Sequence, residues 1–161
     1  MDIFNKYAFH RITPDTNPII FSALSELDKK CVGNEGWSAE SFISEVEKEN
    51  GIVICCYANN CIIGLISGYF AGDEADITSI AVDEKYRHIG IASALITKFE
   101  KNLPEYINEI FLEVRESNIP AISLYEKFKF KKISIRKNFY SNPNENAVVM
   151  KKIKSKEELK C

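Results

Sequence analysis

In residues 77–95 a short apolar run is followed by a polar turn with a glycine and then by an amphipathic segment. This succession limits the possible folds more than any other feature of the sequence. The run 77–82 is apolar and rich in β-branched residues, which predicts a strand. Apolar residues recur at helical spacing after Gly90 and predict a helix. A helix N-terminus has unpaired N–H groups and a partial positive charge. The stretch therefore predicts a phosphate cradle, although one glycine before a helix also fits a plain tight turn.

The overall composition predicts a soluble, cytoplasmic protein. The 161 residues suit one domain with its own core, and we expect a domain over 1–154 with a charged tail over 155–161. No apolar run is long enough for a membrane span, and the first residues lack a signal-peptide pattern. The net charge of −2 argues against a nucleic-acid partner held by bulk charge.

The cysteines and histidines predict neither a disulfide framework nor a metal site. The five cysteines are odd in number and have no C-x-x-C spacing. The two histidines, His10 and His88, have no cysteine or acidic cluster beside them. We interpret Cys161 as an exposed tail thiol and the other four cysteines as small buried or half-buried hydrophobic residues, namely Cys31, Cys55, Cys56 and Cys61.

Turn and cap residues divide the remaining chain into alternating elements. We expect strands over 7–12, 52–58, 61–70, 77–82, 108–114, 131–140 and 147–153. We expect helices over 18–32, after the cap Ser38 up to a C-cap at Gly51, over 91–103, and after the cap Asn118. Asn59 and Asn60 predict a two-residue hairpin turn. This order predicts an α+β fold with four helices.

The sheet should contain seven strands and be mixed but mostly antiparallel. A strand at 77–82, a helix and a strand at 108–114 make a parallel crossover in its middle. Ligands of open α/β sheets favour the crevice at the carboxyl ends of such a pair. The predicted phosphate cradle lies at that edge.

The pattern R-x-x-G-x-A at Arg87, Gly90 and Ala92 resembles the acetyl-CoA motif Q/R-x-x-G-x-G/A of the GNAT acetyltransferases. The resemblance implies that the main chain of 80–82 faces the pantetheine of acetyl-CoA and that N–H groups of 88–93 hold its pyrophosphate. The implied residues are Ile80, Ala81, Val82, His88, Ile89, Gly90, Ile91, Ala92 and Ser93. Relatives often carry arginine or lysine where His88 stands, which implies one charge fewer at pH 7.

Two further segments resemble one branch of that family. L-E-V-R-E-S-N at 112–118 and L-Y-E-K-F at 124–128 are similar to the bacterial ribosomal-protein-alanine N-acetyltransferases, the RimI branch. G-W-S at 36–38 and R-K-N-F-Y at 136–140 resemble its P-W-S and R-x-N-Y-Y segments. The similarity covers nearly all of 7–152 and implies the GNAT fold. It also implies acetyl transfer to a protein α-amine, typically the N-terminal alanine of a small-subunit ribosomal protein.

The resemblance assigns catalytic roles to Glu113 and Tyr125. An α-ammonium has a pKa of about 7.7–8.0, against about 10.4 for lysine, so a carboxylate can make it nucleophilic. Glu113 alternates with buried neighbours and is the candidate base, although a solvated or arginine-paired strand carboxylate fits the same spacing. Tyr125 is the candidate proton donor to the leaving thiolate, although its apolar helix stripe also fits a core tyrosine.

The same resemblance places substrate and cofactor contacts elsewhere. Asn118 corresponds to a CoA-contacting asparagine and also suits an N-cap. Trp37, Phe139 and Tyr140 would wall the groove for the acceptor N-terminus, although Trp37 also suits a hydrophobic staple with Phe42. The chain departs from the family pattern at three positions besides His88, which are Gly36 for proline, Phe139 for tyrosine and Lys129 for glycine.

Two other functions remain open at this point. A GNAT protein could acetylate a small amine or a lysine side chain. A non-catalytic acyl-CoA-binding regulatory module could use the same fold. Glu113 and Tyr125 together favour catalysis, which acetyl-CoA turnover with alanine-starting peptides would test.

Overall fold

The computed structural model describes residues 2–154. The charged tail predicted over 155–161, including Cys161, lies outside the described residues. Within the described part, none of the helices combines the length and apolar character that a membrane crossing needs.

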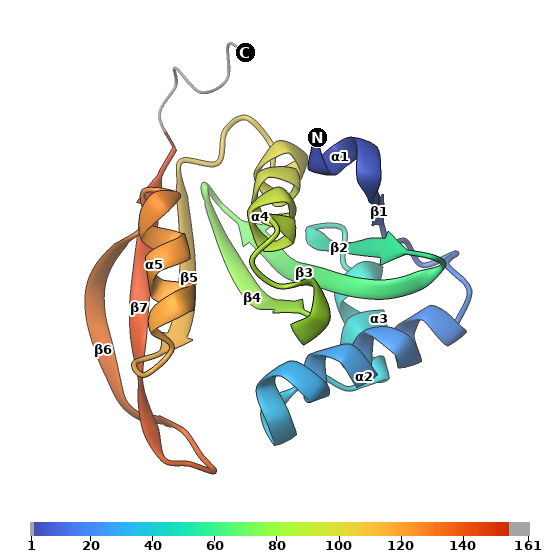
Figure 1. Ribbon diagram of the computed structural model, residues 1–161. Coiled ribbons are helices and arrows are strands. Elements are labelled where there is room, and N and C mark those ends of the chain that lie inside the picture. The colour runs from blue at the N-terminus through green and yellow to red at the C-terminus, as the bar shows by residue number, and fades with distance from the viewer. Residues whose placement is uncertain (1, 155–161) are drawn as a thin grey trace. The chain divides into compact units, whose positions relative to one another are not determined.

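The described residues form the elements labelled in Figure 1. The helices are α1 (Ile3–Lys6), α2 (Ile19–Val32), α3 (Ala39–Glu47), α4 (Ile91–Asn102) and α5 (Ile119–Lys127), with 3₁₀ turns η1 (Gly33–Glu35) and η2 (Glu84–Tyr86). The strands are β1 (Ala8–Arg11), β2 (Gly51–Ala58), β3 (Cys61–Ala71), β4 (Glu74–Val82), β5 (Glu109–Arg115), β6 (Lys131–Tyr140) and β7 (Glu145–Ile153). The four predicted helices are present, and the one-turn α1 is an addition that the sequence pattern did not predict.

The strands form one seven-stranded sheet in the order β1-β2-β3-β4-β5-β7-β6. β4 and β5 pair in parallel from Glu74 with Glu109 to Ile77 with Leu112. The pairs β1–β2, β2–β3, β5–β7 and β6–β7 are antiparallel. The predicted α+β class, with a mixed, mostly antiparallel sheet and a central parallel pair, is confirmed.

The described chain divides into two compact units. The first contains the residues up to Tyr69 together with Thr78–Leu103, and the second contains Phe70–Ile77 together with the residues from Pro104 onward. Strand β4 contributes to both units. The expected single domain over 1–154 stays a prediction.

In the first unit, α2 and α3 pack on one face of the strands. Their shared core contains Ile12, Phe21, Leu24, Leu27, Phe42, Val46, Val53, Cys55, Leu65 and Ala81. Because side chains alternate along a strand, Ile52 and Ile54 point to the other face of β2, which α4 contacts. A Cβ on Gly64 would lie 3.0 Å from Ile91 Cγ2, so glycine at this position lets the start of α4 approach β3 closely.

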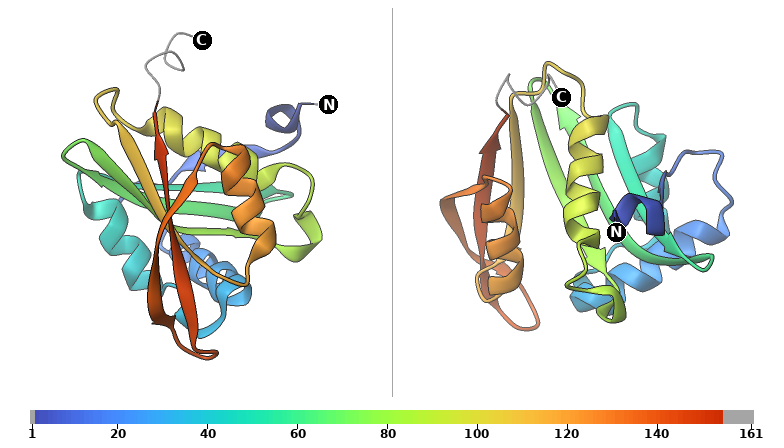
Figure 2. Two further views of the ribbon diagram at one scale, coloured as in Figure 1. Left: turned by 90° about the vertical axis from the view of Figure 1, so that its left-hand side faces the viewer. Right: turned by 45° about the horizontal axis from the view of Figure 1, so that its top comes forward.

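In the second unit, β6 and β7 form a long twisted hairpin (Figure 2). Its register shifts twice, between Lys132 and Ser134 and between Arg136 and Tyr140. Strand β5 alternates strictly between buried and half-exposed residues, as its sequence predicted. The half-exposed set is Glu109, Phe111, Glu113 and Arg115.

Several local predictions are confirmed. Ser38 caps α3 by accepting a hydrogen bond from the Ser41 N–H. Asn59 and Asn60 both have positive φ, 49° and 62°, as a two-residue hairpin turn of this kind requires. Lys129, which stands where relatives carry glycine, has a left-handed backbone with φ 69°, a conformation that strains a lysine.

Three predictions need correction. Helix α3 ends at Glu47 with Lys48 as its C-cap, so Gly51 is not a helix cap and instead begins β2. A Cβ at Gly51 would lie 1.9 Å from the Glu45 carbonyl oxygen, so this close approach requires glycine there. Cys61 is exposed at the start of β3, whereas the pattern predicted a buried or half-buried residue. The strand predicted over 77–82 begins earlier, at Glu74, where it pairs with β5.

Candidate active site

Bonds within the first unit hold the turn between β4 and α4. The Asp83 carboxylate accepts a hydrogen bond from the Lys85 N–H at 3.0 Å and caps η2. Arg87 Nε donates to the Val82 carbonyl oxygen at 3.0 Å, and the Cys31 thiol reaches that oxygen at 3.4 Å. The loop start is therefore fixed, and the Val82 carbonyl is engaged within the unit.

Two residues with left-handed backbone turn the chain into α4. The φ angle is 63° at His88 and 96° at Gly90, and Gly90 is the N-cap of the helix. Glycine adopts this conformation freely, whereas histidine does so at some cost. Gly90 provides no capping side chain, so the first N–H groups of α4 remain available as donors. Such a helix start suits a phosphate group.

The predicted cofactor residues of the first unit differ in exposure. His88, Ile89 and Gly90 are exposed, and Ile80, Val82, Ala92 and Ser93 are half-buried. The side chains of Ala81 and Ile91 are buried, so only their main-chain groups could reach a ligand. This distribution fits a cradle made of backbone groups.

Trp37 lies half-buried just before α3. Its ring centroid is 5.4 Å from that of Phe42, which confirms the predicted hydrophobic staple. A Cβ on the preceding Gly36 would lie 2.6 Å from the Lys29 backbone, and the Gly36 N–H donates to the Gly33 carbonyl at 2.9 Å. A proline at position 36 would clash there and remove that bond, so local packing explains this departure from the family pattern.

Glu113 forms an ion pair in the second unit. Its Oε1 lies 2.5 Å from Arg136 Nη1, and the two side chains are 30% and 56% exposed. The structure therefore contains the arginine-paired arrangement that the strand spacing also allowed. The partial exposure leaves this carboxylate within reach of solvent.

Tyr125 occupies the interior of the second unit. It is buried, and its ring meets that of Phe130 edge to face with 6.0 Å between centroids. Burial raises the pKa of the Tyr125 phenol, and the nearby Tyr140 acts in the same direction. The phenol therefore keeps its proton at neutral pH. At the start of the same helix, Asn118 Oδ1 accepts a hydrogen bond from the Ala121 N–H at 3.3 Å, which confirms its capping role.

Phe139 and Tyr140, two of the three predicted groove aromatics, each lie against a guanidinium. Arg136 Cζ is 4.5 Å from the ring centroid of Phe139, and Arg115 Cζ is 4.4 Å from that of Tyr140. The two rings meet edge to face at 5.0 Å. Because Arg136 also pairs with Glu113, the structure brings Glu113 and Phe139 to one guanidinium.

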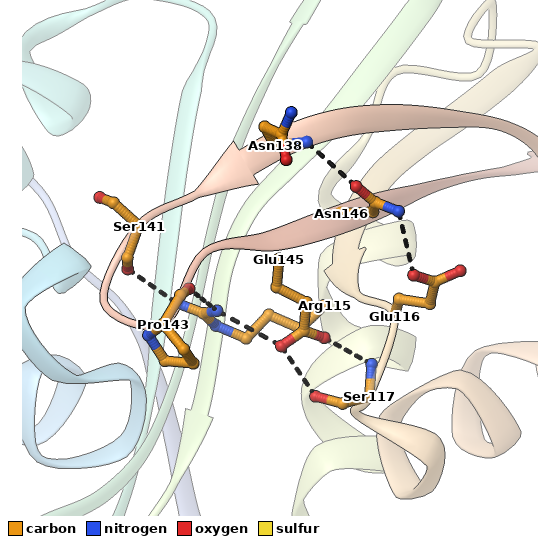
Figure 3. A network of polar contacts seen from close by, with 8 residues as sticks. All are labelled: Arg115, Glu116, Ser117, Asn138, Ser141, Pro143, Glu145 and Asn146. Atoms are coloured by element: carbon orange, nitrogen blue, oxygen red, sulfur yellow. Dashed lines mark hydrogen bonds and ion pairs between the residues drawn. The ribbon is translucent and has the colours of Figure 1, made fainter.

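A polar network ties the β6–β7 turn to the end of β5 (Figure 3). Arg115 donates to the carbonyl oxygens of Pro143 and Ser141 at 3.2 and 3.4 Å, and its Nη1 lies 3.5 Å from Glu145 Oε1. Glu145 accepts hydrogen bonds from the Ser117 N–H at 2.6 Å and from the Ser117 hydroxyl at 3.0 Å. These bonds from Ser117, with Arg115 adding to them, lower the pKa of Glu145.

Sequence reasoning missed the partners in this network. It assigned no contact to Arg115 and no role to Glu145. A second link in Figure 3 joins Asn138, Asn146 and Glu116 through the Asn146 amide. These contacts join residues far apart in the chain, and no local spacing signals such pairs.

The described residues include no group of three or more histidine, cysteine, aspartate or glutamate side chains arranged to hold a metal ion.

Known proteins resemble this chain in sequence and in fold. An N-alpha-acetyltransferase of Saccharolobus solfataricus is 47% identical over 76 residues, which are 46% of this chain and 45% of that protein. A [ribosomal protein bS18]-alanine N-acetyltransferase of Haemophilus influenzae is 43% identical over 96 residues, covering 57% of this chain and 65% of that one. The chain thus spans about half to two thirds of the length of these curated relatives.

The fold comparison agrees with the sequence comparison. The crystal structure of the ribosomal-protein-S18-alanine N-acetyltransferase from Escherichia coli superposes with a TM-score of 0.76 at 27% identity, covering 91% of this chain and 94% of that one. A GNAT family acetyltransferase from Elizabethkingia anophelis, solved with acetyl-CoA bound, shares the fold at a TM-score of 0.72 and 21% identity. The model of the acetyltransferase (GNAT) family matches residues 19–130. The chain belongs to the acetyltransferase (GNAT) family.

Proposed function

We propose that this chain transfers an acetyl group from acetyl-CoA to the α-amine of a protein N-terminus, with the N-terminal alanine of a small-subunit ribosomal protein as acceptor. The names of its relatives support both the reaction and the acceptor class. The observation that carries the proposal is the uncapped start of α4 at the left-handed Gly90, an anion cradle in a chain of this family.

The residues of the cradle bind rather than react. N–H groups over 88–93 hold the pyrophosphate of acetyl-CoA, and main-chain groups of Ile80 and Ala81 contact its pantetheine arm. The exposed backbone at Gly90 fits this role because no side chain stands between the N–H groups and an anion. Asn118 both caps α5 and contacts CoA.

Glu113 acts as the base, directly or through a water molecule. The bound α-ammonium first releases one proton to solvent; the resulting amine nitrogen then forms a bond to the thioester carbonyl carbon, its second proton passes to Glu113, and the carbon–sulfur bond breaks. Tyr125 gives its phenolic proton to the departing thiolate, so the products are an N-acetyl peptide and CoA. Burial raises the pKa of Tyr125, so the phenol holds its proton at neutral pH.

The α-ammonium of the acceptor can bind at the Glu113 carboxylate in place of Arg136. The incoming α-ammonium carries the same charge as the Arg136 guanidinium and can replace it beside the carboxylate. Arg136 is 56% exposed, so its side chain has room to move away. Contacts to the acceptor chain are proposed for Trp37 in the first unit and for Phe139 and Tyr140 in the second.

The test compares acceptors in one turnover assay with the purified full chain. The acceptors are an alanine-starting peptide, the same peptide with a blocked α-amine and one lysine, and a polyamine. The proposal predicts release of CoA with the first acceptor only. Equal turnover of the lysine peptide or the polyamine would contradict the protein N-terminus as the acceptor. Binding of acetyl-CoA without turnover of any acceptor would favour a regulatory module.

A further inference from the structure

Asp28 is a buried acid that the proposed reaction does not use. It lies on α2 with 1% of its surface exposed, and Ser25, one turn earlier on the same helix, is 7% exposed. A buried carboxylate is costly unless hydrogen bonds satisfy both of its oxygens. Its partners therefore indicate what the residue is for.

Both polar backbone groups of Trp37 bond to this face of α2. The Trp37 N–H donates to Asp28 Oδ2 at 2.7 Å, and the Trp37 carbonyl accepts from the Ser25 hydroxyl at 2.7 Å. The two side chains are three residues apart on a helix, so they lie side by side on one face. The main chain of Trp37 is thus held at its N–H and at its carbonyl.

The other oxygen of Asp28 reaches the sheet. Ser79 Oγ of β4 donates to Asp28 Oδ1 at 2.5 Å. Ser79 directly precedes Ile80, the first residue of the strand segment that we propose contacts the pantetheine arm. One carboxylate therefore joins the Trp37 loop to the cofactor strand, and all four residues belong to the first unit.

The loop depends on this join more than the strand does. Strand β4 has neighbours in the sheet, and Ala81 packs in the core. The loop before Trp37 contains the 3₁₀ turn η1 and two glycines, Gly33 and Gly36, and it has no strand partner in the described sheet. Loss of the carboxylate should therefore free the loop and leave the strand in place.

We propose that Asp28 is a positioning residue that fixes the Trp37 loop on β4 and so sets the affinity for the acceptor amine. The inference rests on the proposed function, because it takes the Trp37 loop as a wall of the acceptor path. It goes further by naming a residue that touches neither substrate yet controls one of them.

Trp37 is the only tryptophan of the chain, so its fluorescence reports on this loop without any turnover. We expect Asp28→Ala to raise the rate of acrylamide quenching about twofold or more. The Trp37 N–H loses its hydrogen bond in this variant, so the loop and its indole ring become more mobile. The KM for the acceptor peptide should rise about tenfold, which is the change in affinity expected from the loss of one charge-assisted hydrogen bond. The Kd for acetyl-CoA should stay within about twofold of the wild-type value.

Two variants and a control separate positioning from folding. Asp28→Asn can accept from the Trp37 N–H through its oxygen and donate to Ser79 through its amide, so we expect near wild-type quenching and KM. Ser79→Ala removes only the strand contact and should give an intermediate effect. Glu45→Ala removes another buried carboxylate, on α3, and should leave quenching and KM unchanged even if it alters stability.

The inference is overturned if Asp28→Ala leaves quenching and acceptor KM unchanged, or if it weakens acceptor and acetyl-CoA binding equally. It is also overturned if Asp28→Asn is as impaired as Asp28→Ala. Failure of the proposed function looks different, because wild-type protein would then not acetylate the alanine-starting peptide at all.

Discussion

The two units differ in the groups that form their candidate site: main-chain groups in the first unit and side chains in the second. In the first unit, the proposed anion cradle consists of backbone, with left-handed residues at His88 and Gly90 and the start of α4. In the second unit, the candidate base is a side chain whose surroundings are other side chains, Arg136 first among them. A backbone site depends on local conformation, whereas a side-chain site depends on partners from distant strands.

We expect the largest effect on activity from neutralising the candidate base, Glu113. Glu113→Gln keeps the shape of the side chain but removes its basicity, and we expect kcat/KM for an alanine-starting peptide to fall about 10²- to 10⁴-fold. Steady-state kinetics measure the change. Acetyl-CoA binding, for which we propose the start of α4 and Asn118, should not change.

Glu109→Gln is the matched control for that variant. Glu109 lies on the same half-exposed face of β5 and also pairs with a cation, Lys151, at 3.1 Å. It should retain near wild-type kcat/KM. Equal losses in both variants would mean that ion pairs on this face act only on the fold.

The backbone half is tested at Gly90. Alanine in the left-handed conformation costs about 1–2 kcal/mol, so the loop of Gly90→Ala should relax away from it in the free protein and have to return to it on binding, which should weaken acetyl-CoA binding roughly tenfold. No atom crowds the added Cβ, because the nearest is Ile3 Cδ1 at 3.8 Å. Isothermal titration with acetyl-CoA measures the effect.

Gly72→Ala supplies the comparison. Gly72 also has positive φ, 61°, and open space around its Cβ position, but it lies in the turn between β3 and β4. It should lose similar stability and keep its affinity for acetyl-CoA. If both variants bind acetyl-CoA equally well, the start of α4 is not the cradle.

The same contrast explains what the sequence could and could not predict. The strand, the turn and the helix around Gly90 follow one another in the chain, so spacing alone located them. The alternation of β5 placed Glu113 on the half-exposed face for the same reason. The pairing of Glu113 with Arg136 requires the order β5-β7-β6, in which β7 lies between the two strands. No local rule gives that order.

Other misses have the same physical origin. The contact between Asp28 and Ser79 joins α2 to β4, and Glu145, the first residue of β7, binds Ser117 just after the end of β5. Gly51 was predicted as a helix cap because spacing shows a glycine after a helix but not the Glu45 carbonyl beside it. The roles of these residues depend on contacts with distant parts of the chain, which local spacing does not show.

A smaller effect tests the strained backbone of the second unit. Lys129 has φ 69°, so Lys129→Gly should stabilise the fold by about 1 kcal/mol. Urea denaturation measures the change. Asn60→Gly is the control, because asparagine tolerates its φ of 62° and little gain is expected. No gain at Lys129 would mean that contacts of the lysine side chain offset the strain.

The smallest expected effect is a pH dependence in the first unit. Burial raises the pKa of Asp28, and hydrogen bonds from Ser79 and Trp37 only partly oppose it. The folded state therefore holds this proton more tightly than the unfolded state, whose aspartate pKa is about 3.9. Stability falls as pH rises from there through the folded pKa, by at most about 1.4 kcal/mol per pH unit.

Asp28→Asn lacks this titration. The free energy of unfolding of the variant, relative to wild type, should thus increase as pH rises from 4 through the folded pKa. Denaturant titrations at several pH values measure it. A difference that stays constant or decreases with pH would contradict the assigned direction.

One fragmentation spectrum tests acetyl transfer to an N-terminal α-amine. A peptide with a free alanine α-amine and an internal lysine is incubated with acetyl-CoA and the full chain, and tandem mass spectrometry locates the acetyl group. The account predicts the acetyl group on the alanine nitrogen and an unmodified lysine. Acetyl on the lysine alone, or on neither amine, would contradict it.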